Sequence, residues 1–269
     1  MIMTMKNNPL DYITATMVIS YDCPRKYYYE YVEGWKLVKP LANLVFGSIL
    51  HESIAEEFLN GRKATDAFLE KWSKVGELTY SRADNHESLR KIGIALIEKV
   101  QKTEIYQRVV AVEKVYQTEL PDGTIFKGKV DLIYDNGKEE VLLDWKTSSS
   151  LFLDHRPDLD DQLTAYSMLS GISKVAYGVL LKKKEPEVKF FYAQRTYQDY
   201  LDYQLKVMKV VSDIESGFFF KKPSIYCGFC PFCPLCRNQE EKIKTELKRV
   251  PVEDRYAGID CEEVLVCLV

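Results

Sequence analysis

Long apolar runs are missing from this 269-residue sequence, and so is a strong excess of charge of either sign. No run approaches the roughly 20 residues that a membrane-spanning helix needs, so we expect no membrane partner. Residues 1–10 lack the apolar core of a secretory signal, which predicts a cytoplasmic protein with reduced thiols. The net charge of −3 argues against a protein that coats DNA by charge alone.

Linkers and repeats are missing too: no Gly-, Ser- or Pro-rich stretch divides the chain, and no internal repeat is visible. Apolar periodicity predicts helices over about 22–32, 41–60, 64–79, 83–103, 158–170, 196–215 and 237–248. It predicts strands over about 109–119, 124–134, 140–147, 174–182 and 187–194. This order predicts an α/β protein whose central β-sheet is flanked by helices.

Three charged residues flank a strong hairpin signal. Asp131 precedes the turn sequence Asp-Asn-Gly-Lys at 135–138, and Asp144 and Lys146 follow it. If Asn-Gly is a two-residue turn, Asp131 opposes Leu142 and shares its sheet face with Asp144 and Lys146. The two carboxylates are then diagonal neighbours, roughly 7 Å apart at the backbone. A four-residue loop keeps this parity, whereas a three-residue loop breaks it.

Two carboxylates on rigid strands make a hard oxygen site that suits Mg²⁺ or Mn²⁺. Such an ion favours phosphoryl chemistry, and Lys146 could orient or deprotonate water or stabilise the transition state. The alternative is an ordinary hairpin with a surface salt bridge. Glu113, on the strand before Asp131, is a weaker candidate, for which a solvated strand residue is the better interpretation.

Two helical segments carry further candidates. His51 lies in the predicted helix 41–60, one turn after Gly47, where a glycine lets a backbone or a ligand come near. Gln162 and Tyr166 are i,i+4 partners and share one helix face. For His51 the alternative is a satisfied helix histidine, and for the other two it is simple packing.

Together these motifs resemble the PD-(D/E)XK nucleases, specifically their RecB-like and Cas4-like branch, over about residues 17–240. The segment Phe-Gly-Ser-Ile-Leu-His at 46–51 looks like the helix of the metal-binding histidine, and Asp131 matches the first acidic ligand. Asp-Trp-Lys at 144–146 matches the (D/E)XK strand, and Gln162 to Tyr166 matches QxxxY. The resemblance departs at Val130, which stands where the family name has proline.

The resemblance implies a restriction-endonuclease-like core and a set of roles. Mg²⁺ or Mn²⁺ would be held by His51, Asp131, Asp144 and the Trp145 carbonyl. Lys146 would assist the attacking water, with Gln162 and Tyr166 as further catalytic residues. We expect one domain over 1–269, with an N-terminal helical lobe at about 20–105, a nuclease core at about 106–215 and a cysteine region at about 220–240.

Seven cysteines are present: Cys23, Cys227, Cys230, Cys233, Cys236, Cys261 and Cys267. In a chain with reduced thiols, the dense run from 227 to 236 indicates metal binding rather than disulfides. The run is too compact for a zinc ribbon, and C-x2-C-x2-C spacing occurs in iron–sulfur proteins.

The family resemblance implies a more specific solution, because its iron–sulfur members pair an N-terminal cysteine with a C-terminal C-x2-C-x5-C. Cys227, Cys230 and Cys236 fit that spacing, and Cys23 stands in a matching Cys-Pro-Arg segment. A structural 4Fe-4S cluster on these four residues would close the cysteine region onto Cys23. Zinc, or Cys233 in place of a neighbour, remain the alternatives.

The function implied is a metal-dependent deoxyribonuclease, a hydrolase that acts as an exonuclease on DNA ends or single strands. No helicase motif is visible, so a helicase, recombination or CRISPR partner protein would supply any unwinding. The alternative is a non-catalytic or weakly active DNA-end-binding subunit of a CRISPR-adaptation or recombination complex. Polarity of digestion, strand preference, oligomeric state and biological pathway do not follow from the residues.

Overall fold

The computed structural model of the chain describes residue 10 and residues 12–251, so Cys261 and Cys267 lie outside the described residues. The chain divides into two compact units. Unit 1 combines the described residues up to Val38 with Val115–Gly128 and the described residues from Gln198 onward. Unit 2 combines Lys39–Lys114 with Lys129–Tyr197. The predicted helical lobe is therefore shared between both units, and the expectation of one domain remains a prediction.

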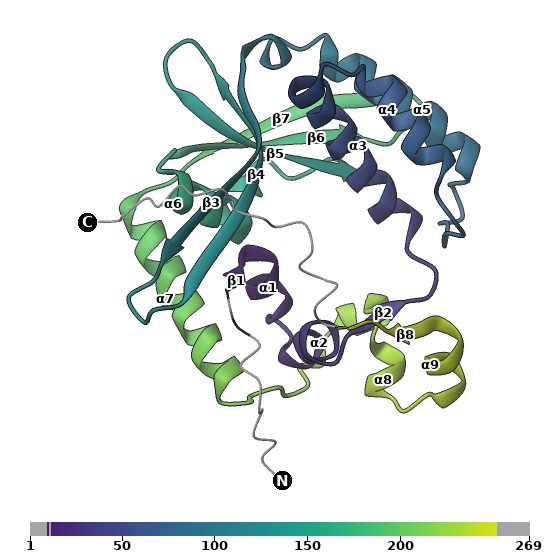
Figure 1. The fold of residues 1–269 in the computed structure, drawn as a ribbon, viewed down its shortest axis with the longest axis vertical. Coiled ribbons are helices and arrows are strands. Elements are labelled where there is room, and N and C mark those ends of the chain that lie inside the picture. Colours follow the sequence, from purple (N-terminus) through teal and green to yellow (C-terminus); the bar gives the residue numbers. More distant parts are fainter. Residues whose placement is uncertain (1–9, 11, 252–269) are drawn as a thin grey trace. The chain divides into compact units, whose positions relative to one another are not determined.

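Unit 2 is built on a mixed β-sheet (Figure 1). Its strands are the later part of β4 (Ile125–Asp135), β5 (Glu140–Ser148), β6 (Lys174–Leu181) and β7 (Glu187–Gln194). β4 and β5 are antiparallel, β5 and β6 are parallel, and β6 and β7 are antiparallel. β3 (Val109–Glu119) pairs with β4, and both strands run through both units.

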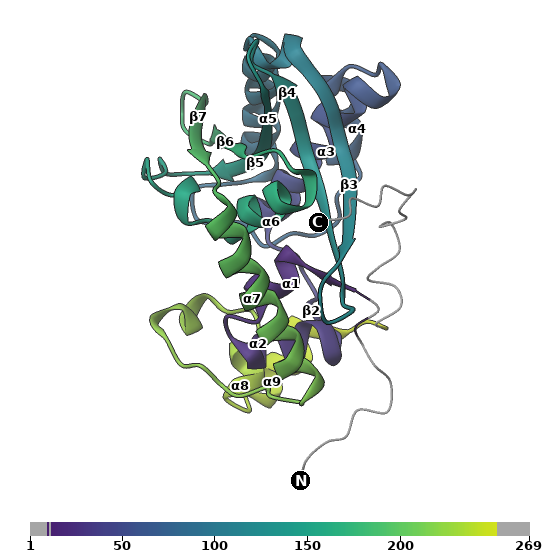
Figure 2. The same ribbon diagram turned by 90° about the vertical axis from the view of Figure 1, so that its left-hand side faces the viewer.

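Helices cover both faces of this sheet (Figures 1 and 2). On one side lie α3 (Ala42–Asn60), α4 (Ala64–Ser73) and α5 (His86–Gln101), and on the other lies α6 (Asp161–Ser170). The main core lies under α3–α5, where Phe46, Phe68 and Trp72 meet Leu143 and Trp145 of β5. The predicted α/β class with a central mixed sheet and flanking helices is therefore confirmed.

Local sequence signals fix where these helices begin and end. The Asn85 side chain accepts from the N–H of Ser88, and the Ser88 hydroxyl accepts from the N–H of Asn85, which starts α5 with a capping box. α3 ends at Gly61, whose φ of +68° favours glycine. The close approach expected at Gly47 is to β5, because a β-carbon there would lie 2.8 Å from Thr147 Oγ1.

Unit 1 contains shorter elements around the cysteine run. Its elements are β1 (Ile13–Thr14), α1 (Ala15–Ser20), α2 (Pro24–Tyr27), a π-helix (Tyr28–Val32), β2 (Trp35–Leu37), most of α7 (Tyr197–Glu215), a 3-10 helix (Ile225–Phe229), α8 (Cys233–Cys236), α9 (Glu240–Glu246) and β8 (Leu247–Arg249). The predicted helix 237–248 is shorter, because its end pairs as β8 with β2. Among the described helices, none has the length and apolar character to cross a membrane.

Candidate active site

The hairpin of β4 and β5 brings the two aspartates together. Leu132 faces Leu143 and Asp135 faces Glu140, so the loop spans residues 136–139. The even loop keeps the predicted parity, but the predicted register is wrong by two residues. Continued by one residue, the observed register aligns Asp131 with Asp144 rather than with Leu142. The cause is Asn136, whose side chain accepts from the N–H groups of 138 and 139 and moves the turn along the chain.

The strands part next to Asp131. The pairing of β4 with β5 ends at Leu132 and Leu143. Beyond that point, Trp145 N–H donates to Asp131 Oδ2 over 2.9 Å, so a side chain takes the place of a strand carbonyl. This exchange anchors the Asp131 carboxylate beside Asp144, which is 2% exposed.

Lys146 links the hairpin to α6. Its Nζ lies 2.5 Å from Asp144 Oδ2 and donates to Gln162 Oε1 over 2.6 Å. Because an ammonium only donates, the Gln162 amide must turn its oxygen to Lys146 and its nitrogen to the Tyr166 hydroxyl, 2.7 Å away. One chain of polar contacts therefore joins the predicted pair Asp144 and Lys146 on β5 to the predicted pair Gln162 and Tyr166 on α6.

His51 reaches the same place from α3. Its Nδ1 lies 3.5 Å from Asp131 Oδ2, while its Nε2 is buried and has no hydrogen-bond partner. A buried nitrogen without a partner costs free energy unless some ligand binds it. Burial also lowers the pKa of His51 to about 4, which keeps a lone pair available on the neutral ring at pH 7.

The charges of the site are set by burial. Burial raises the pKa of Asp131 and of Asp144 to about 6. Burial also disfavours the Lys146 ammonium, but the Asp144 carboxylate, with Asp131 and Asp160, outweighs this effect and raises the pKa of Lys146. The site therefore holds two destabilised carboxylates against one firmly protonated amine.

The site contains nitrogen and oxygen atoms of the kinds that bind divalent metal ions. Among residues 10 and 12–251, no three His, Cys, Asp or Glu side chains are gathered closely enough to hold a metal ion. Two carboxylate oxygens are instead engaged by Lys146 and by the Trp145 N–H. In kind the donors fit, because carboxylates and an imidazole are ligand types that such an ion accepts: His51 Nδ1 lies 3.5 Å from Asp131 Oδ2, and His51 Nε2 is buried without a partner.

Glu113 is more closely tied to the site than its sequence indicated. Its φ of 52° lies in the left-handed region, within strand β3. Its carboxylate forms an ion pair with Lys129, and its charge acts on both His51 and Asp131. Strained backbone of this kind gathers at functional sites, but no sequence pattern marks it.

Arg195 is a second residue that the sequence did not single out. It is 4% exposed and lies just after β7. Its Nε donates to Thr164 Oγ1 over 2.7 Å, and its Nη2 donates to the carbonyls of Pro157 and Asp160. Arg195 thereby holds the start of α6, the helix that carries Gln162 and Tyr166.

The cysteine run of unit 1 lies apart in sequence from these residues, and its four thiols and that of Cys23 are free. Burial raises the pKa of the Cys230 and Cys236 thiols, and both residues pack against one small group of apolar side chains. Cys227 is exposed, and its Sγ accepts from the Ser224 N–H over 3.3 Å. Tyr29, Phe232 and Leu247 form a small apolar cluster beside them.

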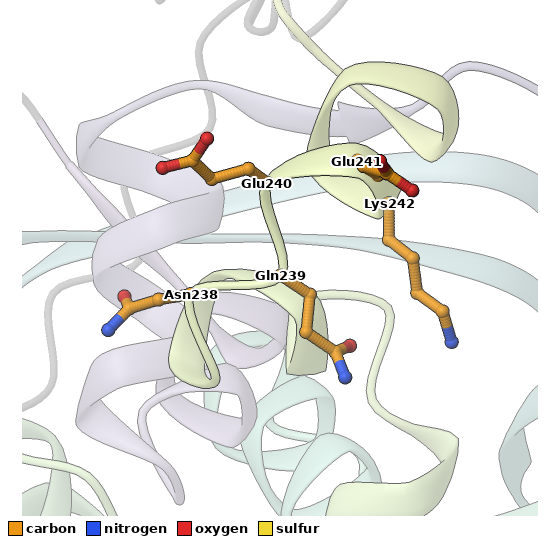
Figure 3. A pocket seen from close by; sticks show the side chains of 5 residues that line it. All are labelled: Asn238, Gln239, Glu240, Glu241 and Lys242. Carbon is orange, nitrogen blue, oxygen red and sulfur yellow. The ribbon is translucent and has the colours of Figure 1, made fainter.

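A shallow hollow in unit 1 is a weaker candidate (Figure 3). It is lined by Asn238, Gln239, Glu240, Glu241 and Lys242. The side chains point in different directions instead of converging on one point, so the hollow offers no set of groups that could act together.

Known proteins are similar to this chain over most of its length. A family model described as the PD-(D/E)XK nuclease superfamily matches residues 20–237. A solved structure from Eubacterium rectale, described as a "putative exonuclease", is similar at 17% identity and a TM-score of 0.54, over 93% of this chain and 94% of that one. At this identity the likeness shows the fold alone.

A second solved structure, of a protein named SSO0001, has 16% identity and a TM-score of 0.43, over 87% of this chain and 88% of that one. A score of that size supports no inference. No curated protein matches the chain.

Proposed function

This chain belongs to the PD-(D/E)XK nuclease superfamily, and from that membership we propose that it is a metal-dependent deoxyribonuclease. We propose further that it works as an exonuclease on DNA ends or single strands, in the RecB-like and Cas4-like branch. A cytoplasmic location, and a helicase, recombination or CRISPR partner protein that presents the DNA, belong to the same proposal.

One observation carries the proposal: in unit 2, pairwise contacts link the residues that match the family motif. Lys146 joins Asp144 to Gln162, Gln162 joins Tyr166, and Asp131 lies between Trp145 and His51. An ordinary hairpin with a surface salt bridge would not bury Asp144 or hold its lysine through a second element.

The chain's own groups supply charge and orientation. Lys146 stays protonated beside Asp144, so it acts as a fixed cation for the charge that develops on the scissile phosphate, rather than as a base. Gln162 and Tyr166 set the direction of that ammonium. Burial raises the pKa of Asp131 and Asp144, so a cation bound between them would offset the cost of keeping both carboxylates charged.

His51, Asp131, Asp144 and the Trp145 carbonyl would hold Mg²⁺ or Mn²⁺. When bound, the ion would lower the pKa of a water molecule and neutralise charge on a phosphoryl oxygen. Support comes from the His51 Nε2, which is buried without a partner, and from the mixed nitrogen and oxygen donors.

The test is digestion of end-labelled single- and double-stranded DNA with Mn²⁺, using protein purified without oxygen. We expect Asp131→Asn and Lys146→Gln to lose at least about a hundredfold in rate, since each removes charge aimed at the reacting group. The matched controls are Asp135→Asn on the same strand and Lys138→Gln in the hairpin loop, both exposed.

Cleavage by Asp131→Asn at the rate of the natural chain would overturn the mechanism. DNA that is bound but left intact by the natural chain would instead favour the non-catalytic DNA-end-binding subunit.

We also propose a structural 4Fe-4S cluster on Cys23, Cys227, Cys230 and Cys236. Support comes from two contacts between the N-terminal segment and the C-terminal run: Arg25 N–H, two residues after Cys23, donates to the Phe220 carbonyl, and Cys230 and Cys236 pack against the cluster that contains Tyr29. Cys233 is the alternative to Cys227 as a ligand, because Cys227 is exposed whereas Cys233 is half-buried.

Absorption near 400 nm and the iron and sulfide content of protein purified without oxygen test this cluster. We expect both signals in the natural chain and their loss in Cys23→Ser. Zinc without iron would contradict the cluster. Comparison of Cys227→Ser with Cys233→Ser then decides which of the two is the ligand.

A further inference from the structure

Unit 1 exposes a series of large apolar side chains between residues 218 and 229. We call them the apolar platform, and its members are Phe218 (60% exposed), Phe220 (54%), Ile225 (84%), Tyr226 (72%) and Phe229 (87%). Exposing several such side chains within one segment leaves a large apolar area in water, which marks interaction sites in soluble proteins.

The backbone under the first part of the platform is held in place. Phe219 turns inward and stacks on Tyr27, with 6.2 Å between ring centroids and 6° between their planes. Arg25 N–H donates to the carbonyl of Phe220 over 3.0 Å. Because neighbours in an extended chain point to opposite sides, the inward Phe219 turns Phe218 and Phe220 outward.

The second part of the platform is a short helical turn, Ile225–Phe229. Ser224 caps it, since its hydroxyl accepts from Tyr226 N–H over 3.2 Å and its carbonyl accepts from Cys227 N–H over 3.1 Å. The exposed rings thus project from a backbone that hydrogen bonds hold in place. Little conformational freedom is therefore lost when a ligand covers them.

Within the segment that carries the platform, the charge is of one sign. Residues 216–239 contain Lys221, Lys222 and Arg237 but no Asp or Glu, in a chain whose net charge is −3. Lys221 Nζ donates to the Cys236 carbonyl over 2.7 Å, which fixes its stem beside the cysteine run, and Lys222 and Arg237 are exposed. The platform therefore suits a ligand that is both flat and anionic.

We propose that the apolar platform binds single-stranded DNA, with unpaired bases stacked on Tyr226 and Phe229 and phosphates beside Lys222. A single strand offers open base faces and phosphates together, whereas a duplex hides its base faces within the stack. A protein partner would have to supply acidic groups as well as an apolar surface. This inference rests on the proposed deoxyribonuclease function. It adds that unit 1 binds the DNA in its single-stranded form.

Fluorescence anisotropy of a labelled oligothymidylate, and of a duplex of equal length, tests the proposal with the full chain purified without oxygen, in buffer without Mg²⁺ or Mn²⁺ so that no cleavage occurs. We expect Tyr226→Ala and Phe229→Ala each to weaken single-strand binding by about fivefold or more, because each removes a stacking surface. The matched control is Tyr197→Ala, since Tyr197 is 74% exposed but lies at the start of α7, outside the platform. We expect that variant to bind as the natural chain does.

Salt dependence separates the phosphate contact from stacking. We expect Lys222→Gln to reduce the slope of log affinity against log salt by about 0.7, the value for one contact to a single strand. Phe229→Ala should lower the affinity at every salt concentration and leave the slope unchanged. Circular dichroism and thermal unfolding should be the same for all these variants, because the side chains they change are largely exposed.

Equal single-strand affinity of Phe229→Ala and the natural chain would overturn the proposal, and so would equal loss of single-strand and duplex binding. A change in oligomeric state without a change in DNA affinity would assign the platform to a protein partner and overturn it as well. None of these outcomes touches the nuclease proposal, which fails if the natural chain leaves DNA intact or if the Asp131 and Lys146 variants still cleave it.

Discussion

At the scale of single residues, the site is a set of buried charges that do not balance. Asp131 and Asp144 face one ammonium, Lys146, and burial raises the pKa of both carboxyl groups. An uncompensated carboxylate lowers the stability of a folded protein. A cation that binds beside it removes this cost.

Asp131→Asn should therefore stabilise the protein in metal-free buffer. The folded pKa of about 6 exceeds the unfolded 3.8, so the natural chain loses stability as pH rises from about 4 to 6. The asparagine keeps an acceptor for Trp145 N–H without the charge. We expect a gain on the order of 1–3 kcal/mol at pH 7 that vanishes near pH 4, measured by urea unfolding.

The exposed Asp135→Asn is the control for this measurement, and it should change little. A gain in Asp131→Asn that stays constant between pH 4 and pH 7 would contradict the role assigned to this carboxyl group.

Glu113 offers a test of strain at the same scale. Its left-handed φ costs roughly 1–2 kcal/mol, which glycine would not incur. We expect Glu113→Gly to leave stability unchanged or raise it by about 1 kcal/mol, while the DNA cleavage rate falls because the carboxylate is lost. Lys114→Gly, next in the strand and without a positive φ, should lower stability by about 0.5–1 kcal/mol.

Thermal unfolding and DNA digestion of both variants check this prediction. Glu113→Gln separates charge from backbone, since it keeps the strain and loses only the charge. Full cleavage by Glu113→Gln would show that this carboxylate has no part in the site.

At the scale of elements, the site depends on how α6 is set against β5. Asp160 caps α6 by accepting from Leu163 N–H, and Arg195 donates to the carbonyls of Pro157 and Asp160. Gln162 can meet Lys146 only while this helix start stays in place. Arg195 is therefore a positioning residue that acts through α6.

Arg195→Met should remove the donor of the hydrogen bonds to Thr164 Oγ1 and to the carbonyls of Pro157 and Asp160, and destabilise the protein by on the order of 2–3 kcal/mol. We expect kcat to fall and KM to change little at a temperature where the variant is folded, because the loss lies in the alignment of Lys146. Arg195→Lys should recover part of kcat, since it restores one donor. Arg90→Met on α5, where Arg90 pairs with Glu87 at the surface, is the control.

A loss of stability without any change in kcat of the folded Arg195→Met variant would reduce Arg195 to a purely structural residue.

At the scale of the whole molecule, each unit joins segments that are far apart in sequence. In unit 1, α2 with its Cys23 cap comes together with the 227–236 run, and β2 pairs with β8. A cross-link between such distant points stabilises chiefly by restricting the unfolded chain.

Cys23→Ser should lower the melting temperature of protein purified without oxygen by several degrees, at about 2–4 °C for each kcal/mol lost. Cys233→Ser should lower it less if Cys227 is the ligand. The same comparison after chelation and loss of iron should show no difference between Cys23→Ser and the natural chain, because the link is then absent from both. A persistent difference would assign the effect to packing.

Much of this molecule follows from local sequence. The strands β3 to β7 and the helices α3, α5, α6 and α7 begin and end within a few residues of the positions that periodicity predicts. The common face of Asp131, Asp144 and Lys146 follows from parity, because side chains alternate along a strand whatever packs around it. The pairing of Gln162 with Tyr166 follows in the same way from the pitch of a helix.

Tertiary structure decided the rest, because it depends on contacts between residues that no local period relates. The Asn136 turn shifted the register by two residues, and packing of α3 on β5 brought His51 to Asp131. The strained backbone of Glu113 and the hydrogen bonds of Arg195 to the start of α6 form only when the helices pack on the sheet. The sequence by itself determined which groups share a strand face or a helix face, and the packed chain determined which of their atoms meet.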